Sequence, residues 1–189
     1  MSLWNTELNG SSIHLAVESS CGGTSLGIQL ARQVIEGGGR VLWASPEIPN
    51  PTRFSQIFSG IDLTASSRFH ATNLVGNVDK AFKSLSNSAK ILPNVELVVI
   101  DDYAPKISVI PKDIIVAVND FVSQASWTTL LISKGGVSMS GEPLVARAVN
   151  KIKTDQIWLL TRPDSDSKRK LFIGDEKVDL ILKESGFHC

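Results

Sequence analysis

The stretch Ser12–Glu36, SIHLAVESSCGGTSLGIQLARQVIE, decides the fold that we expect for this chain. Its first part, Ser12–Val17, is a short apolar run typical of a buried strand. In Ser25–Glu36 the apolar residues recur at helical spacing, which predicts an amphipathic helix. A Ser/Gly-rich turn joins the two, so a helix begins directly after a strand. Backbone amides and the helix dipole favour an anion at such a helix start.

The same alternation of strands and helices continues along the chain. Apolar runs predict further buried strands at Arg40–Ala44, Phe69–Leu74, Leu97–Ile100 and Thr128–Ser133. Helical spacing predicts helices at Asn77–Ala89 and Lys112–Ala125. A continuous β-branched run between helices, such as Leu97–Ile100, is typical of a parallel strand that is covered on both faces.

The pattern changes after residue 141. Pro143–Ile152 predicts a short helix, and strand-like segments follow at Gln156–Thr161, Arg169–Ile173 and Lys177–Lys183. Short turns join these segments and imply antiparallel pairing. We therefore expect one domain, residues 1–189, of the α/β class. It would contain a mainly parallel, twisted sheet flanked by helices, with an antiparallel C-terminal extension.

Composition excludes several classes of protein. The 189 residues carry 19 Lys and Arg against 19 Asp and Glu, which argues against a surface dominated by nucleic acid or anionic lipid. Neither a span of ~18 apolar residues nor a signal peptide is present, so we expect a soluble, cytoplasmic protein without a membrane partner. The two cysteines and three scattered histidines predict no disulfide framework and no zinc site.

The turn after the first strand aligns with a phosphate-binding loop. That pattern is Gly, four residues, then Gly-Lys-Ser/Thr. In Glu18–Ser25, Gly23 is the second glycine and Ser25 the hydroxyl, whereas Glu18 replaces the first glycine and Thr24 the lysine. A carboxylate repels phosphates and the lysine's attraction is lost, so both changes weaken polyphosphate binding. The candidate nucleotide-binding residues are Gly22, Gly23, Thr24 and Ser25.

Other residues would supply the remaining parts of a nucleotide site. Asp101, after the most apolar strand, is placed to hold magnesium through water together with Ser25. Glu47, just past the second strand, is placed to polarise a water, as a vestigial catalytic residue. Lys134 could reach the phosphates as a substitute cation. The alternative for each acid is a solvated group at a strand end, and for Lys134 a solvated loop lysine.

These features are shared with one known group of proteins. Glu18–Ser25 corresponds to its P-loop, Glu47 to its catalytic glutamate, Leu97–Asp102 to its Walker B strand and Ser133-Lys134 to its γ-phosphate sensor. The chain thus resembles the RecA/RadA/KaiC superfamily of recombinase-like ATPases, in its archaeal RadA, RadB and KaiC-like branch. The resemblance implies a RecA-like P-loop NTPase fold. It also implies ATP and magnesium as cofactors, and a homo-oligomer or an active RecA-like paralogue as partner.

Two regions bear on DNA binding. Gly135–Gly141 takes the place of the superfamily's DNA-binding loop but contains no Arg or Lys, so binding through it would be weak. The start of the chain, a dozen residues before the first strand, leaves no N-terminal DNA-binding or polymerisation domain in our expectation. Lys168, Arg169 and Lys170 form a basic group that could contact a nucleic-acid backbone; the alternative is a charged hairpin tip.

Two hypotheses for the function follow. In the first, the chain is a RecA/RadA-like ATPase-core paralogue with a degenerate Walker A motif that does not hydrolyse ATP. It acts as an assembly or regulatory partner in DNA recombination or repair. In the alternative, it is a nucleotide-binding ATPase of the RecA/KaiC type that uses a substitute cation. The first leaves open whether ATP and magnesium bind, whereas the second requires both.

Overall fold

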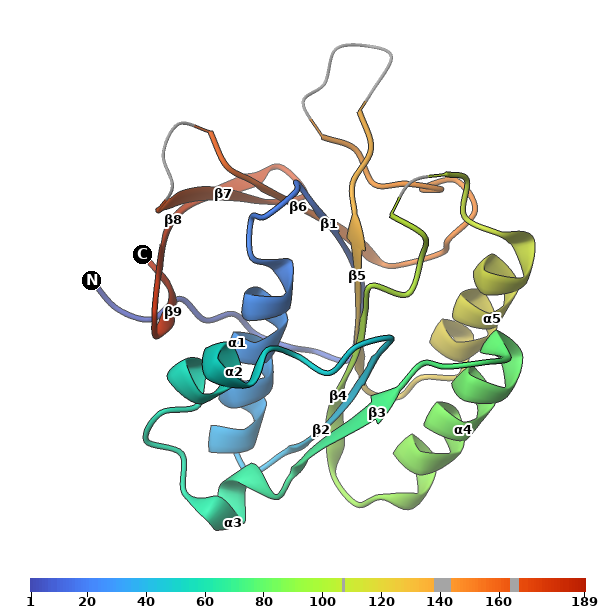
Figure 1. Cartoon of the computed structure of the whole chain (residues 1–189), viewed down its shortest axis with the longest axis horizontal. Coiled ribbons are helices and arrows are strands. Elements are labelled where there is room, and N and C mark those ends of the chain that lie inside the picture. Colours follow the sequence, from blue (N-terminus) through green and yellow to red (C-terminus); the bar gives the residue numbers. More distant parts are fainter. Residues whose placement is uncertain (107, 138–143, 164–166) are drawn as a thin grey trace.

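A computed structural model describes residues 1–106, 108–137, 144–163 and 167–189, and in this part the strands form one nine-stranded sheet (Figure 1). The strands are β1 (Ser12–Val17), β2 (Arg40–Ser45), β3 (Phe69–Asn73), β4 (Val95–Asp101), β5 (Thr128–Lys134), β6 (Gln156–Thr161), β7 (Lys168–Ile173), β8 (Glu176–Lys183) and β9 (Gly186–His188). The helices are α1 (Gly23–Glu36), α2 (Pro51–Ile57), α3 (Leu63–Ser66), α4 (Val78–Ile91) and α5 (Lys112–Ser123).

The sheet has the order β3-β2-β4-β5-β1-β6-β7-β8-β9. Strands β1 to β6 pair in parallel, and β7, β8 and β9 add to the β6 edge in antiparallel pairs. The α/β class, the mainly parallel sheet and the antiparallel C-terminal extension that the sequence predicts are confirmed. The carboxyl ends of parallel strands lie at one edge, so the loops after β1, β2, β4 and β5 lie side by side.

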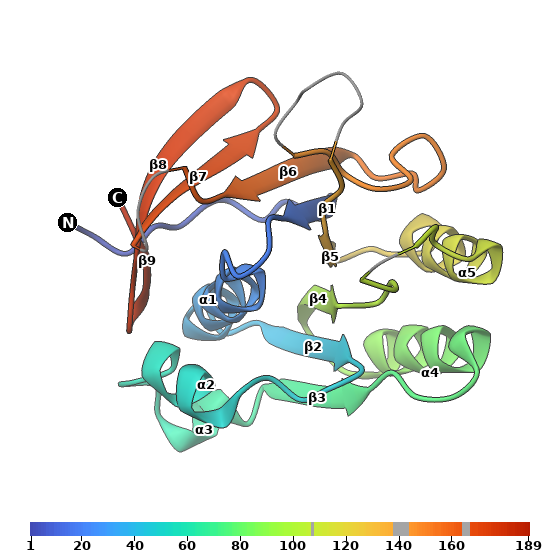
Figure 2. The ribbon, with the colours of Figure 1, turned by 45° about the horizontal axis from the view of Figure 1, so that its top comes forward.

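Helices cover both faces of the sheet (Figure 2). On one face, α1 packs with its buried Leu26 and Leu30 into the cluster around Trp43, and α2 and α3 lie on the same side. On the other face, Phe82 of α4 and Phe121 of α5 belong to a second cluster. Central strands are buried on both faces, which is why they read as continuous apolar runs.

Gln29 of α1 fastens the last strand and the N-terminal segment to the helix. Its side chain is 1% exposed. The Nε2 atom donates to the carbonyl oxygens of Trp4 (2.5 Å) and Phe187 (3.1 Å), and Oε1 accepts from the Phe187 amide (2.6 Å). One side chain therefore satisfies three buried backbone groups from opposite ends of the chain.

The expected helix at 143–152 is wrong for the described residues 144–152, which contain turns and no helix. Val145 instead exchanges backbone hydrogen bonds with Gly136 in an isolated antiparallel bridge. Ala148 follows with a φ of 53°, a left-handed conformation that interrupts a right-handed helix. Arg147 donates to the carbonyl oxygen of Pro105 at 2.5 Å and so ties this segment to the loop after β4. Residues 138–141 of the expected DNA-binding loop, and position 143, lie outside the described residues.

The proline-containing segment after β2 folds into α2, a helix that the sequence analysis does not predict. Asn50 caps this helix by accepting from the Arg53 amide at 3.0 Å, and Pro51 takes its first position. Asn is a good N-cap and proline suits the first turn because the amide it lacks would have no helical partner. In the described part of the chain, no helix is long and apolar enough to cross a membrane.

Candidate nucleotide site at the carboxyl edge of the sheet

A cleft of about 620 Å³ lies at the carboxyl edge of the sheet. The loops after β1, β2, β4 and β5 line it, together with the first turns of α1 and α2. In α/β sheets this edge is where ligands bind. Most of the candidate residues expected from the sequence lie here: Gly22, Gly23, Thr24, Ser25, Glu47, Asp101 and Lys134.

The loop between β1 and α1 presents the start of the helix to the cleft. Gly22, the residue before the helix, has a φ of 95° and, as a glycine, offers no side chain to cap the helix start. Helical hydrogen bonding begins with the Leu26 amide, which donates to the Gly22 carbonyl at 2.9 Å. Amides of the first turn have no helical partner, so this end of α1 favours an anion in the cleft.

The Glu18 carboxylate is held at one side of this loop. Its Oε2 atom accepts from the Arg162 amide at 2.8 Å, at the end of β6, and lies 3.9 Å from the Cys21 sulfur. Burial, with the Glu18 charge second, raises the pKa of the Cys21 thiol to about 11. Cys21 is therefore a protonated, buried thiol at neutral pH.

Thr24 and Asp101 join the helix to the sheet. The Thr24 hydroxyl donates to Asp101 Oδ2 at 2.8 Å. Asp101 is 7% exposed, and burial raises its pKa to about 6, although the Thr24 hydrogen bond works in the opposite direction. A hydroxyl and a carboxylate in contact are a suitable donor pair for magnesium. The hydroxyl in direct contact with Asp101 is thus that of Thr24, whereas the sequence analysis paired Asp101 with Ser25 through magnesium.

Ser25 lies instead against Arg53 of α2. Arg53 Nε donates to Ser25 Oγ at 2.9 Å, and Nη1 donates to the Glu184 carbonyl, between β8 and β9, at 2.7 Å. Nη2 is buried and has no hydrogen-bond partner among the described residues. Burial lowers the Arg53 pKa. Sequence reasoning assigned no role to Arg53; the Asn50-Pro51 helix start, which places it in the first turn of α2, is the signal that could have located it.

Glu47 stands on a turn that is fixed from the core. Trp43 Nε1 donates to Ser45 Oγ at 3.1 Å, and Ser45 Oγ donates to the Glu47 carbonyl at 2.5 Å. Trp43 is fully buried, whereas Glu47 is exposed and lines the cleft. The fixed turn therefore holds a solvated carboxylate at the edge of the cleft.

Two lysines also border the cleft. Lys134, at the end of β5, is exposed, and the neighbouring Gly135 amide donates to the Val17 carbonyl at 2.9 Å. Lys106 lies after β4 with its Nζ 3.4 Å from Asp102 Oδ2. Both are solvated cations on the rim, in contrast to the anchored guanidinium of Arg53.

A buried polar group lies behind the end of β5. His14 Nε2 is 3.1 Å from Ser133 Oγ and 3.3 Å from the Tyr103 hydroxyl. His14 is fully buried, and this burial lowers its pKa to about 4. The imidazole is therefore neutral at pH 7 and holds Ser133, which lines the cleft, by a hydrogen bond.

The structure does not bring Lys168, Arg169 and Lys170 together on one surface. They lie on β7, where alternate side chains point to opposite faces. Arg169 is 4% exposed, and its Nε donates to the Cys21 carbonyl at 2.9 Å, whereas Lys168 is exposed and Lys170 half-buried. Arg169 therefore supports the loop before α1 from the sheet side.

Two solved structures are similar to this chain. The RadB recombinase matches with a TM-score of 0.71 and 15% identity, over 95% of this chain and 90% of that one. The second structure, an ATPase domain, matches with a TM-score of 0.69 and 11% identity, over 96% of this chain and 85% of that one. No protein-family model matches the sequence, and no curated protein does. The chain thus has the RecA-like fold that its sequence predicts.

Proposed function

We propose that this chain is a RecA-like paralogue with a degenerate Walker A motif that does not hydrolyse ATP and acts through association with other protein subunits. The observation that carries this proposal is the closed space beside Gly23. A β-carbon at position 23 would lie 2.6 Å from Val17 Cγ2 and 3.1 Å from Ile132 Cγ2. A side chain at position 23, such as the P-loop lysine, therefore requires Val17 to move.

Position 23 matters because of the register that the Thr24 contact supports. In a P-loop, the Ser/Thr after the lysine and the Walker B aspartate hold magnesium together. Thr24 is the hydroxyl that meets Asp101. Gly23 then takes the lysine position, and Val17, six residues before it, takes that of the first glycine. Both key positions of the motif are therefore replaced, and the two replacements pack against each other.

ATP and magnesium have only part of their usual binding groups here. Thr24 and Asp101 would hold the metal, and the amides at the start of α1 would face the phosphates. Magnesium held there would neutralise negative charge on the phosphates. The loop itself offers no cation to share that task, which argues against hydrolysis rather than against all binding.

The partner and the cellular process that we propose rest on the structural similarity to RadB. RadB is a recombinase, and we extend to this chain a role in DNA recombination or repair as homo-oligomer or as partner of an active RecA-like ATPase. Sedimentation velocity of the chain alone, and mixed with such an ATPase, measures this association. If the chain stays monomeric both alone and in the mixture, the result contradicts the partner role.

Phosphate release with ATP and magnesium tests the absence of hydrolysis. We expect no turnover above the buffer rate in the native chain or in Glu47→Gln. Glu176→Gln, at an exposed position of β8, is the matched control. Turnover that disappears in Glu47→Gln but persists in Glu176→Gln would reject the proposal.

A second function is favoured by one observation, the buried and unpartnered Nη2 of Arg53 in the cleft, which has no hydrogen-bond partner among the described residues. In this alternative the chain binds nucleotide, with Arg53 or Lys134 replacing the P-loop lysine. Isothermal titration with ATP and magnesium separates the two cations. Lys134→Ala and Arg53→Ala each remove one of them, and an affinity unchanged in both variants would exclude a substitute cation of this kind.

A further inference from the structure

The antiparallel extension of the sheet is covered by a helix on one side only. Figure 2 shows α1 below β6, β7 and β8, and among the described helices none lies over their other side. On the α1 side, Leu160, Leu171 and Leu180 of these strands belong to the cluster around Trp43. We name the other side the outer face. Its residues are the alternate ones of the three strands, because successive side chains of a strand point to opposite faces.

The outer face contains apolar side chains that belong to neither core cluster. Its residues are Ile157, Leu159 and Thr161 of β6, Lys168, Lys170 and Phe172 of β7, and Lys177, Asp179, Ile181 and Lys183 of β8. Leu159 and Phe172 are register partners on neighbouring strands, and both are half-buried. Ile157, two residues before Leu159, is 37% exposed. These three residues form an apolar strip that is absent from both core clusters of the described chain.

Lysines border this apolar strip. The charged residues of the outer face are four lysines and one aspartate: Lys168, Lys170, Lys177, Lys183 and Asp179. Lys177 is the register partner of Phe172, and Asp179 is that of Lys170. Neither Lys170 nor Lys177 forms an ion pair with a described residue. Two further acids lie off the face: Asp175 is in the β7–β8 turn, and Glu176 alternates with Lys177 and so belongs to the α1 side. The outer face itself is therefore positively charged.

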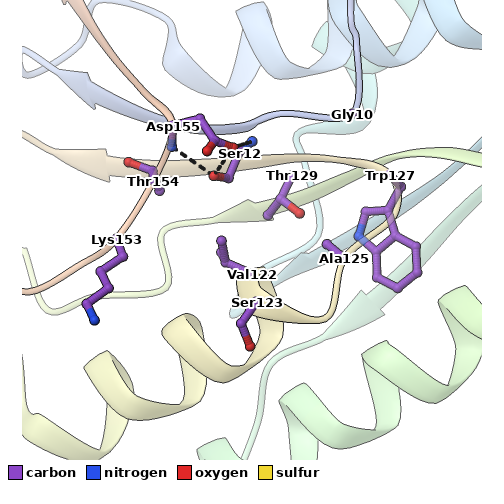
Figure 3. A pocket seen from close by; sticks show the side chains of 10 residues that line it. All are labelled: Gly10, Ser12, Val122, Ser123, Ala125, Trp127, Thr129, Lys153, Thr154 and Asp155. Atoms are coloured by element: carbon purple, nitrogen blue, oxygen red, sulfur yellow. Dashed lines mark hydrogen bonds between the residues drawn. The ribbon is translucent and has the colours of Figure 1, made fainter.

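The strands under the outer face are fixed in the sheet. Asp155, just before β6, accepts with Oδ2 from the amide and the hydroxyl of Ser12 on β1, both at 2.7 Å, as Figure 3 shows. Arg169 of β7 donates to the Cys21 carbonyl at 2.9 Å on the α1 side. In the described sheet, β6, β7 and β8 each have a strand on both sides. Their backbone groups are thus already paired, so a partner contacts this face through side chains and not as an added strand.

We propose that the outer face binds an amphipathic helix of a partner protein, whose apolar stripe is flanked by acidic residues. Neighbouring strands are about 4.8 Å apart, so β6 and β8 are separated by about 10 Å, which is the width of one α-helix. The six residues of β7 span about 20 Å, the length of a helix of about 13 residues. On the same side of the sheet, α4 and α5 cover the parallel strands, and the bound helix would continue that layer.

Two kinds of contact would hold this helix. Its apolar stripe would remove Ile157, Leu159 and Phe172 from water, which favours binding in proportion to the area buried. Its acidic flanks would pair with Lys170 and Lys177, which fixes the orientation of the helix and speeds its association. The inference rests on the association with protein subunits proposed above and adds the chemistry of the surface that the partner presents.

A single-stranded nucleic acid is the competing occupant, because lysines also attract phosphates. Sequence-tolerant binding of a single strand uses aromatic rings on which the bases stack. Phe172 is the one aromatic residue of the outer face, and its neighbours Ile157 and Leu159 are aliphatic. Asp179, beside Lys170, would repel a phosphate. These features favour the protein helix.

Three synthetic helical peptides of about 14 residues test the proposal. The first has a leucine stripe at helical spacing with glutamates on both flanks. In the second, lysines replace the glutamates, and in the third, glutamines replace the leucines. We expect the first peptide to shift the backbone amide resonances of β6, β7 and β8 saturably in ¹⁵N NMR spectra of the chain, with a Kd of roughly 10–500 μM. The second and third peptides should bind at least tenfold more weakly.

Variants of the outer face locate the binding. Lys177→Glu reverses one charge and Phe172→Gln removes the ring, and each should weaken the first peptide at least fivefold. The matched controls are Lys80→Glu, at an exposed position of α4, and Leu63→Gln, at a position 90% exposed; both should leave its affinity unchanged. Lys177 is exposed, so the fold should survive its replacement, and thermal unfolding of each variant is measured alongside.

The absence of a saturable shift in β6, β7 and β8 would overturn the proposal, as would equal binding of the three peptides. An oligothymidylate that binds the outer face more tightly than the first peptide, and is lost in Lys177→Glu, would assign the face to nucleic acid instead. The titration uses the chain alone and reads neither ATP turnover nor sedimentation. An association with other subunits that persists in Lys177→Glu and Phe172→Gln would therefore reject this face and leave the proposed function intact.

Discussion

The side chain of Val17 occupies the space beside Gly23, so that a β-carbon at position 23 would meet Val17 Cγ2 at 2.6 Å. Val17 ends β1, and Gly23 begins α1. The side chain of Val17 therefore fills the space into which the lysine side chain of a P-loop would extend. We therefore expect that replacing only one of the two residues by its P-loop counterpart does not restore ATP binding.

Val17→Gly together with Gly23→Lys converts residues 17–24 into GESSCGKT, which matches the P-loop pattern. We expect the double variant to bind ATP and magnesium at least tenfold more tightly than the native chain, measured by titration calorimetry. Gly23→Lys alone should destabilise the fold by about 1–3 kcal/mol through overpacking. Thr24→Lys, which breaks the contact with Asp101, is the control and should give no gain. A gain in Thr24→Lys instead would restore the register expected from the sequence.

Arg53→Ala should destabilise the fold, because Arg53 links α1 and the β8–β9 turn through Ser25 and Glu184. Losing these charged donors is expected to cost about 1–3 kcal/mol in urea unfolding. Lys83→Ala removes an exposed ion pair with Asp79 and should leave the free energy of unfolding nearly unchanged, because solvent screens the pair. Equal small effects of both variants would contradict an anchoring role for Arg53.

Asp101→Asn should stabilise the protein at pH 8. In the folded state the Asp101 pKa is about 6, above its ordinary value of 3.8. The folded state thus holds this proton more tightly than the unfolded state, and the Asp101 contribution to stability falls as pH rises from about 4 to 6. The variant should lack this loss and gain about 1–3 kcal/mol at pH 8, with little change at pH 4. A lower Tm at pH 8 would contradict this.

His14 has the opposite dependence on pH. Its pKa is about 4 in the folded state against 6.5 ordinarily, so the unfolded state binds the proton first as pH falls. The His14 contribution is complete above about pH 6.5 and is lost as pH falls toward 4, by roughly 3 kcal/mol. His14→Gln should flatten this acid limb in thermal unfolding. Asp101→Asn should steepen it, because the opposing slope of Asp101 is then gone.

Gln29→Ala should loosen β9 and the N-terminal segment. The substitution removes the Gln29 partner of the buried Trp4 carbonyl and of the Phe187 amide, and it leaves the Phe187 carbonyl with the Trp4 amide, at 2.9 Å. We expect a loss of about 3 kcal/mol and faster proteolysis near the C-terminus. Gln33→Ala, which removes contacts to Thr6 nearer the surface, is the matched control with a smaller effect. Equal proteolysis in both would show that Gln29 is not the fastening point.

Hydrophobic periodicity predicts the strands and helices that bury one whole face or both faces. The strand Ser12–Val17 and the helix Lys112–Ser123 lie close to the predicted bounds. Prediction failed where single local contacts decide, as at Ala148 with its positive φ and at the Asn50 cap that starts α2. The pattern of apolar residues does not predict such contacts.

In the candidate site, the sequence located the loop, Glu47 and Asp101, because polar residues after buried strands must gather at one edge of a parallel sheet. It paired Asp101 with Ser25, whereas the direct contact of Asp101 is with Thr24, and it left Arg53 without a role. Both points concern which side chains contact each other. These contacts depend on the loop conformation and not on residue type.

The sequence by itself determined the alternation of the main strands with α1, α4 and α5, the edge at which the cleft forms and the absence of net charge, since these follow from local pattern and composition. Only the tertiary structure decided between Thr24 and Ser25. Neighbouring residues of a helix point about 100° apart, so the left-handed Gly22 that sets where α1 begins selects which hydroxyl faces Asp101. The tertiary structure also places Val17 against Gly23, because the end of β1 lies beside the start of α1.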